Sequence, residues 1–145
     1  MNAPILAPAA ALVAWSLIVL FWMAATRFPA MFKAGLHRRA VAPGGRGQDL
    51  EGLLPANVMW KAHNFTHLME QPTIFYATVT ILALSEAGTG TNVMLAWSYV
   101  GLRILHSLWQ GLVNTVPIRL SLFLLSTGVL AALAVNAVRA TLGAA

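Results

Sequence analysis

Long apolar runs dominate this chain, and their length constrains its fold more than any other feature. Four segments are each long enough for the roughly 20 residues of a transmembrane helix, and they predict helices over about residues 7–36, 56–86, 92–113 and 117–142. Between the first two lies a loop broken by Pro43 and Gly44, and we expect Asn92 to cap the third helix and Pro117 to open the fourth. We therefore predict an all-α fold, a bundle of four transmembrane helices in a single integral membrane domain over residues 1–145.

The composition agrees with a multi-pass membrane protein. Hydrophobic residues make up 59% of the chain and charged residues 9%, where soluble domains have about 25% charged residues. The chain has no cysteine, which excludes disulfides, thiolate metal ligands and cysteine nucleophiles. The net charge of +5 gathers around one loop, so we attribute it to membrane orientation and not to nucleic-acid binding.

The basic residues predict how the chain sits in the membrane. The second connection has no Lys or Arg. Most basic residues surround the first loop or follow the third connection: Lys33, Arg38, Arg39, Arg46, Lys61 and Arg119. Since cytoplasmic loops are enriched in Lys and Arg, the first and third connections are predicted to be cytoplasmic and both termini to lie outside the cytoplasm. We expect the N-terminal apolar run to be retained as the first span.

Arg103 lies in the middle of the third apolar run, where a lipid-facing arginine costs about 2.5–3.5 kcal/mol. His106, Gln110 and Asn114 follow it on the same helical face. That face must contact protein or water, and Arg103 needs an anion. Of the four acidic residues only Glu70 lies deep in another apolar run, so we predict that Glu70 and Arg103 form a buried ion pair.

A second polar stripe, on the second helix, contains His63, His67 and Glu70 at helical spacing. Such residues can simply hydrogen-bond helices to one another, but two facing stripes with complementary charge favour a functional site that opens to the cytosol. With His106 they could also ligate a metal, yet a neighbouring guanidinium repels a cation, so we predict no metal. An anionic ligand would instead find cationic donors in Arg103, Arg119, His63 and His67.

Arg119, two residues after Pro117, is predicted to lie at the cytoplasmic end of the same site, where its fixed charge and several donors suit an anionic ligand. The alternative interpretation is an anchor to lipid headgroups at the cytoplasmic surface. A hydrophobic ligand would reach this site from the bilayer along four aromatic side chains, Trp60, Phe65, Trp97 and Trp109. The alternative interpretation of each is packing or anchoring at the membrane interface.

The segments HNFTHLMEQPTIFYA and RILHSLWQGLVNTVPIR resemble the MAPEG family, the membrane-associated proteins of eicosanoid and glutathione metabolism. In that family a glutamate on the second helix accompanies an arginine on the third, matched here by Glu70 and Arg103. A histidine follows that arginine after three residues, matched by His106, and a proline and an arginine open the fourth helix, matched by Pro117 and Arg119. The resemblance runs from the second helix to the start of the fourth.

The resemblance implies a homotrimer of four-helix subunits with glutathione bound between neighbours, in a divergent bacterial-type member of the inner membrane. It implies a catalytic Arg119 and cofactor contacts from His63, His67, Glu70, Arg103, His106 and Gln110. This chain departs from the family where Gln110 replaces a tyrosine of several members, and where His63, Thr66 and His67 replace arginines and an asparagine.

Two functions follow from these features. One is a glutathione-dependent transferase or peroxidase that acts on a lipophilic electrophile, with the cofactor on the cytoplasmic side. The other is a non-catalytic MAPEG-like protein that binds a lipid or a protein partner through the same polar site.

Overall fold

A computed structural model describes residues 3–36 and 43–143, so Arg38 and Arg39 of the predicted basic cluster lie outside the described residues. The described part consists of four long helices and no strand: α1 (Leu6–Lys33), α2 (Ala56–Leu84), α3 (Thr91–Leu112) and α4 (Val116–Leu142). A short 3₁₀ helix, η2 (Gly47–Leu50), lies in the loop between α1 and α2. The predicted all-α fold with four helices is confirmed.

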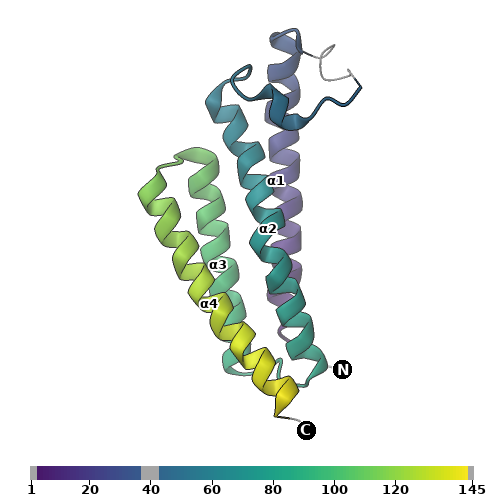
Figure 1. Cartoon of the computed structure of the whole chain (residues 1–145), viewed down its shortest axis with the longest axis vertical. Helices are drawn as coiled ribbons and strands as arrows, with labels where there is room; N and C mark the ends of the chain where they lie inside the picture. Colours follow the sequence, from purple (N-terminus) through teal and green to yellow (C-terminus); the bar gives the residue numbers. More distant parts are fainter. Residues whose placement is uncertain (1–2, 37–42, 144–145) are drawn as a thin grey trace.

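The helices run side by side along the long axis of the molecule (Figure 1). Both termini lie at one end, and the α1–α2 loop and the α3–α4 turn lie toward the other. In the part of the chain described, α2 and α3 contact each other and both outer helices, whereas α1 and α4 do not meet. The two central helices are therefore the ones that can surround a polar site.

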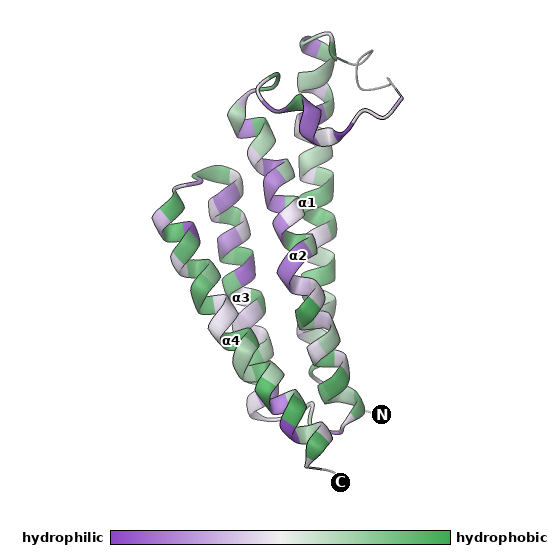
Figure 2. Ribbon diagram, in the orientation of Figure 1, coloured by the Kyte–Doolittle hydropathy of each residue, from purple (hydrophilic) through white to green (hydrophobic). Residues whose placement is uncertain are grey.

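The outer helices are the most lipid-like surfaces of the bundle. Among the described helices, α1 and α4 are long and apolar enough to cross a membrane, and few residues of their apolar stretches are buried within the chain. In α2 and α3, hydrophilic residues gather in the half of the bundle nearer the α1–α2 loop (Figure 2). Their polar stripes make these helices less apolar than a lipid-exposed span, so α2 and α3 are suited to crossing the membrane only with protein beside them.

Apolar packing fixes the two ends of the bundle separately. The half nearer the termini contains the main core, in which the rings of Phe75 and Tyr99 stack with their centroids 4.4 Å apart. A second cluster attaches the α1–α2 loop to the ends of both helices, and it consists of Met31, Leu36, Leu50, Leu54 and Met59. The polar residues described below lie between these two apolar regions.

The starts of α3 and α4 differ in how well the sequence predicted them. Pro117 is in the first turn of α4, as expected. Asn92, in contrast, is not the N-cap of α3, because the helix already begins at Thr91 after Gly90, whose φ is +54°. The Asn92 amide instead donates to the carbonyl of Ala87 (2.9 Å) and accepts from Asn136 of α4 (2.7 Å). It therefore joins the α2–α3 connection to α4.

Candidate functional site

The polar stripe of α3 faces the interior of the bundle, as its spacing predicted. Arg103, His106 and Gln110 are all buried, with exposed fractions of 1%, 3% and 1%. Ser107, on the same side, accepts a hydrogen bond from the indole N–H of Trp15 in α1 (3.0 Å). Burying so many polar groups along one helix is costly unless each finds a partner, so their contacts identify what the site can do.

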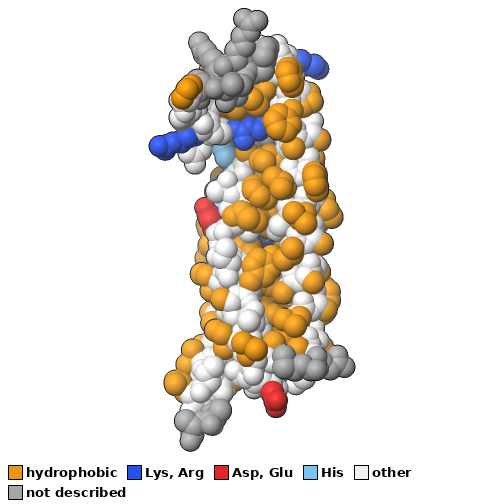
Figure 3. All heavy atoms as spheres, turned by 90° about the vertical axis from the view of Figure 1, so that its right-hand side faces the viewer, with side chains coloured by type: hydrophobic (Ala, Val, Ile, Leu, Met, Phe, Trp, Pro, Cys, Tyr) orange, Lys and Arg blue, Asp and Glu red, His pale blue; other side chains and the backbone are white. Residues whose placement is uncertain are grey.

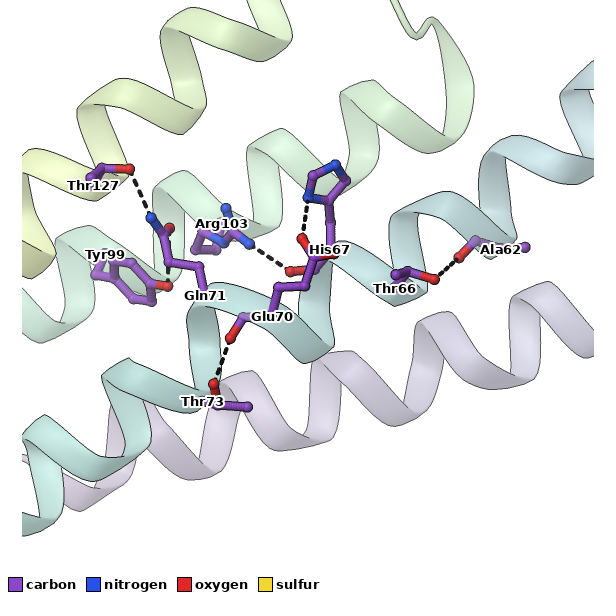
Figure 4. A network of polar contacts seen from close by, with 9 residues as sticks. All are labelled: Ala62, Thr66, His67, Glu70, Gln71, Thr73, Tyr99, Arg103 and Thr127. Atoms are coloured by element: carbon purple, nitrogen blue, oxygen red, sulfur yellow. Dashed lines mark hydrogen bonds and ion pairs between the residues drawn. The ribbon is translucent and has the colours of Figure 1, made fainter. Parts of the chain in front are cut away.

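Arg103 extends from α3 across to the backbone of α2 (Figure 4). Its Nη2 donates to the carbonyl of His67 (2.9 Å), and its guanidinium carbon lies 6.0 Å from the centre of the Phe123 ring of α4. Pro72 lies inside α2 and has no N–H, so the carbonyl of Leu68 loses its usual helical donor. The Leu68 carbonyl is thus available for a polar contact, next to the His67 carbonyl that Arg103 binds.

The predicted ion pair between Glu70 and Arg103 is not formed within the chain. The ion pairs of the described residues are His63–Glu51 and His67–Glu70, and neither contains Arg103. Glu70 lies on the exposed side of α2, where its carboxylate is 3.1 Å from Nδ1 of His67. The prediction was wrong because helical spacing gives the face of each helix but not the rotation of one helix against the other. Instead the His67 imidazole contacts Glu70, while the backbone carbonyl of His67 accepts from Arg103 (Figure 4).

A small pocket of about 180 Å³ lies where α2, α3 and the start of α4 meet. His67, His106 and Arg119 supply its polar lining, and Phe123 is among its apolar walls. The two imidazole rings are 5.9 Å apart, edge to face. A neutral imidazole can donate one N–H, and Arg119 offers a charged fork of donors, so the pocket is suited to an anion or to the lone pairs of a polar ligand.

Arg119 is oriented into this region by the turn before α4. Its Nη1 donates to the side-chain oxygen of Asn114 (2.7 Å), and Asn114 has a left-handed backbone with φ of +58°. A cation in the first turn of a helix opposes the helix dipole, so Arg119 does not serve the stability of α4. A guanidinium beside the free N–H groups of a helix start makes a favourable environment for an anion.

A family model, that of the MAPEG family, matches residues 5–139. The chain belongs to the MAPEG family. It is therefore an integral membrane protein of a family associated with glutathione and eicosanoid metabolism, whose members are typically oligomers in the membrane. Comparisons with curated proteins and with solved structures gave no match.

Of the seven site residues that the sequence of this MAPEG chain singled out, His67, His106 and Arg119 line the small pocket. Arg103 and Glu70 each contact His67. His63 pairs with Glu51 of the α1–α2 loop (3.0 Å) and lines a larger pocket of about 560 Å³, which His67 and Glu70 also line. Gln110 is buried, and its side-chain oxygen has no partner among the described residues. It is not among the residues that line the small pocket.

Three residues near the site were not expected from the sequence. Phe123 of α4 lines the small pocket, while Arg27 of α1 and Glu51 line the larger one with His63. Arg27 had a detectable signal, since an arginine inside the long apolar run of α1 is rare unless it has a function. Phe123 carried no such signal, because an aromatic residue on an apolar helix usually packs.

A further hydrogen-bond network joins α2, α3 and α4 on the side of Arg103 away from His67 (Figure 4). Gln71 of α2 donates to Thr127 of α4 (2.7 Å) and its oxygen lies 3.4 Å from the hydroxyl of Tyr99 (Figure 4). In the described part of the chain no group of three or more His, Asp or Glu residues is placed to hold a metal ion. The site is thus a pocket lined by cationic and aromatic side chains, and the hydrogen bonds of Gln71 hold its helices together nearby.

Proposed function

We propose that this protein is a membrane-embedded glutathione-dependent transferase or peroxidase that acts on a lipophilic electrophile. The observation that carries the proposal is the convergence of Arg119, His67 and His106 on one pocket at the start of α4. Glutathione carries two carboxylates and a thiol, and this donor set fits its anionic groups. The family association with glutathione supports the same ligand.

The size of the pocket supports a site shared between subunits. Ligand pockets usually have volumes of about 300–1,000 Å³, so a pocket of about 180 Å³ would enclose only part of a tripeptide. Glu70 borders this region on the exposed side of α2, where a neighbouring chain would pack. A homotrimer, as the resemblance implies, would supply the missing walls.

Each residue of the pocket has a distinct role in this proposal. When bound, glutathione supplies the thiol nucleophile. Arg119 stabilises the thiolate over the thiol, because an adjacent fixed positive charge favours the anionic form. His67 and His106 donate hydrogen bonds to the ligand, and Glu70 orients the imidazole of His67. Arg103 binds the backbone carbonyl of His67 and so holds α3 against α2 at the site. Phe123 gives the apolar wall against which a lipophilic acceptor packs.

Glutathione binding to the purified full-length protein in detergent tests the proposal. S-methylglutathione serves as a second probe that binds but cannot react. Calorimetry is expected to show saturable binding of both, at least tenfold weaker in Arg119→Lys, because lysine keeps the charge but loses the planar fork of donors. The matched control is Arg139→Lys, near the end of α4 remote from the site. Unchanged affinity in Arg119→Lys would return Arg119 to the role of a headgroup anchor.

The buried position of Gln110 favours a second candidate, a MAPEG protein that binds its ligand without catalysis. Gln110 stands where several members have a tyrosine, and an amide cannot replace a phenol in proton transfer. Turnover assays with an aryl halide and with a fatty-acid hydroperoxide separate the candidates. Product formation that depends on glutathione supports the enzyme, whereas tight binding without any product supports the binding protein.

A further inference from the structure

A third pocket, which adjoins the 560 Å³ pocket of His63, lies between α1 and the α1–α2 loop and has a volume of about 420 Å³. Its walls are apolar side chains of α1 and the loop, including Met23, Ala24, Phe28, Met31 and Leu50. The charged residues of its lining are Arg27 and Arg46, and the lining contains no acidic residue. We call this pocket the α1 groove.

Specific contacts hold the α1 groove in shape. Nη2 of Arg27 donates to the carbonyl of Gly47, which ties the loop to α1. A Cβ added to Gly47 would lie 2.9 Å from Nη2 and 3.1 Å from Nη1 of Arg27, so a larger residue there would displace the guanidinium. The backbone N–H of Arg46 donates to the Asp49 carboxylate (2.7 Å), and Leu50 is buried against α1 and α2. The positions of both arginines are thus determined by the fold.

The charge of the two arginines is left unbalanced. The ion pairs between residues that the structure describes join His63 to Glu51 and His67 to Glu70, and neither arginine takes part. Two guanidinium groups at one end of an apolar groove complement a ligand that has an anionic head and a hydrocarbon tail.

The groove lies at the depth where such ligands occur in a membrane. Arg27 is less than two turns before Lys33, the last residue of α1, which is about 9 Å along the helix axis. An arginine at this depth extends its head toward the interface while its stem stays among apolar groups. Phe21 and Phe28 are 70% and 57% exposed on α1. The face in Figure 3 is largely hydrophobic, with Lys and Arg side chains near the loop end.

We propose that the α1 groove binds an anionic phospholipid of the adjacent leaflet, with its phosphate on Arg27 and Arg46 and one acyl chain along Met23, Ala24 and Phe28. Basic pockets near the ends of transmembrane helices recognise anionic headgroups in this way. The α1 groove shares no residue with the pocket of Arg119, although both of its arginines also line the 560 Å³ pocket with His67. The test therefore measures lipid and glutathione binding separately.

Native mass spectrometry of the full-length protein, released from micelles with phosphatidylglycerol or phosphatidylcholine, tests the proposal without thiol present. At least tenfold preference for phosphatidylglycerol is expected. Arg27→Gln with Arg46→Gln should abolish this preference, and Arg46→Gln alone should reduce it. Ala24→Leu should weaken binding although both charges remain. Lys33→Gln, at the same end but outside the groove, should behave as the unaltered protein.

Several results would overturn the proposal. One is a preference for phosphatidylglycerol in the double variant as strong as that of the unaltered protein. If the double variant does not fold, the same result in Arg46→Gln alone would count, since Arg46 is an exposed loop residue. A second is competition by glycerol 3-phosphate alone as effective as that by phosphatidylglycerol, which would show that the apolar wall contributes nothing. A third is loss of glutathione binding with lipid binding intact in the arginine variants, which would assign both arginines to the thiol site.

Discussion

Arg103 shows how a single residue can be buried at the centre of a site without a counter-ion. Its exposed fraction is 1%, and its Nε and Nη1 have no hydrogen-bond partner among the described residues. What holds it is one carbonyl of α2 and the face of the Phe123 ring. A guanidinium placed over an aromatic ring gains about 0.5–2 kcal/mol, which offsets part of its desolvation. Arg103 therefore joins α3 to the backbone of α2 and forms no ion pair with Glu70 within the chain.

A double-mutant cycle between Glu70→Gln and Arg103→Met should show nearly additive effects, with a coupling below about 0.5 kcal/mol. Arg103→Met should also cost less than the roughly 3–5 kcal/mol typical of a broken buried pair, because no partner charge is left behind. Unfolding in mixed micelles measures both quantities. A coupling above about 1 kcal/mol would mean that Glu70 and Arg103 pair directly in the assembled protein.

Asn114 tests the orientation of Arg119 separately from its charge. Asn114→Gly keeps the left-handed backbone at φ of +58° but removes the oxygen that accepts from Arg119. Loss of a hydrogen bond to a charged group is worth about 1.5–3 kcal/mol, so glutathione affinity should fall by roughly tenfold or more. Thermal unfolding of the same variant should change little. The control is Asn114→Ala, which lacks the oxygen and adds backbone strain, so only this variant should lose stability as well.

At the scale of the helices, apolar length and polar periodicity were sufficient to predict four helices and the inward face of α3. These signals are local, since each depends on residues within one helix. The contact of Arg103 with the His67 carbonyl and that of Arg27 with Gly47 join residues far apart in sequence. They depend on helix rotation and on the path of a loop, which no periodicity encodes. The Asn92 side chain, predicted to cap α3, instead accepts from Asn136 in another helix, a contact that no local pattern encodes.

Two glycines of α3 give a matched test of how closely the helices pack. A Cβ on Gly111 would lie 2.8 Å from the indole ring of Trp22 in α1, whereas a Cβ on Gly101 would meet nothing within 4 Å. Gly111→Ala should therefore destabilise the fold by about 1–3 kcal/mol through overpacking. Gly101→Ala should be neutral or stabilise it by up to about 1 kcal/mol, through helix propensity. Unfolding midpoints in one detergent compare the two, and equal midpoints would mean that α1 and α3 are not tightly packed.

For the whole molecule, the positive-inside rule gives an orientation that cysteine labelling can measure, since the chain contains no cysteine. Gln48→Cys places a thiol in the α1–α2 loop, and Thr89→Cys places one in the α2–α3 connection at the opposite end. In intact cells an impermeant maleimide should label Thr89→Cys, and it should label Gln48→Cys only after the membrane is permeabilised. The reverse pattern would place both termini in the cytoplasm.

The exposed face of α2 leads to the assembly of the whole protein. Glu70 lies near the midpoint of this 29-residue helix, and its side chain is 59% exposed. A carboxylate facing lipid at that depth is costly, so α2 needs a protein neighbour. Along the same face lie Thr73, Ala77 and Thr80, which are small enough for close approach between helices. We expect three chains to meet there, with α2 at the centre.

Ala77→Cys tests this arrangement directly. Mild oxidation should give a disulfide-linked dimer on denaturing gels, because a three-fold axis lets two of three thiols pair, while native mass spectrometry should show three chains. The control Phe21→Cys, on the exposed face of α1, should stay uncrosslinked under the same conditions. Native mass spectra that contain only single chains, with no crosslink at position 77, would leave Glu70 facing lipid. The small pocket would then have to be complete in one chain, and the proposed shared thiol site would be wrong.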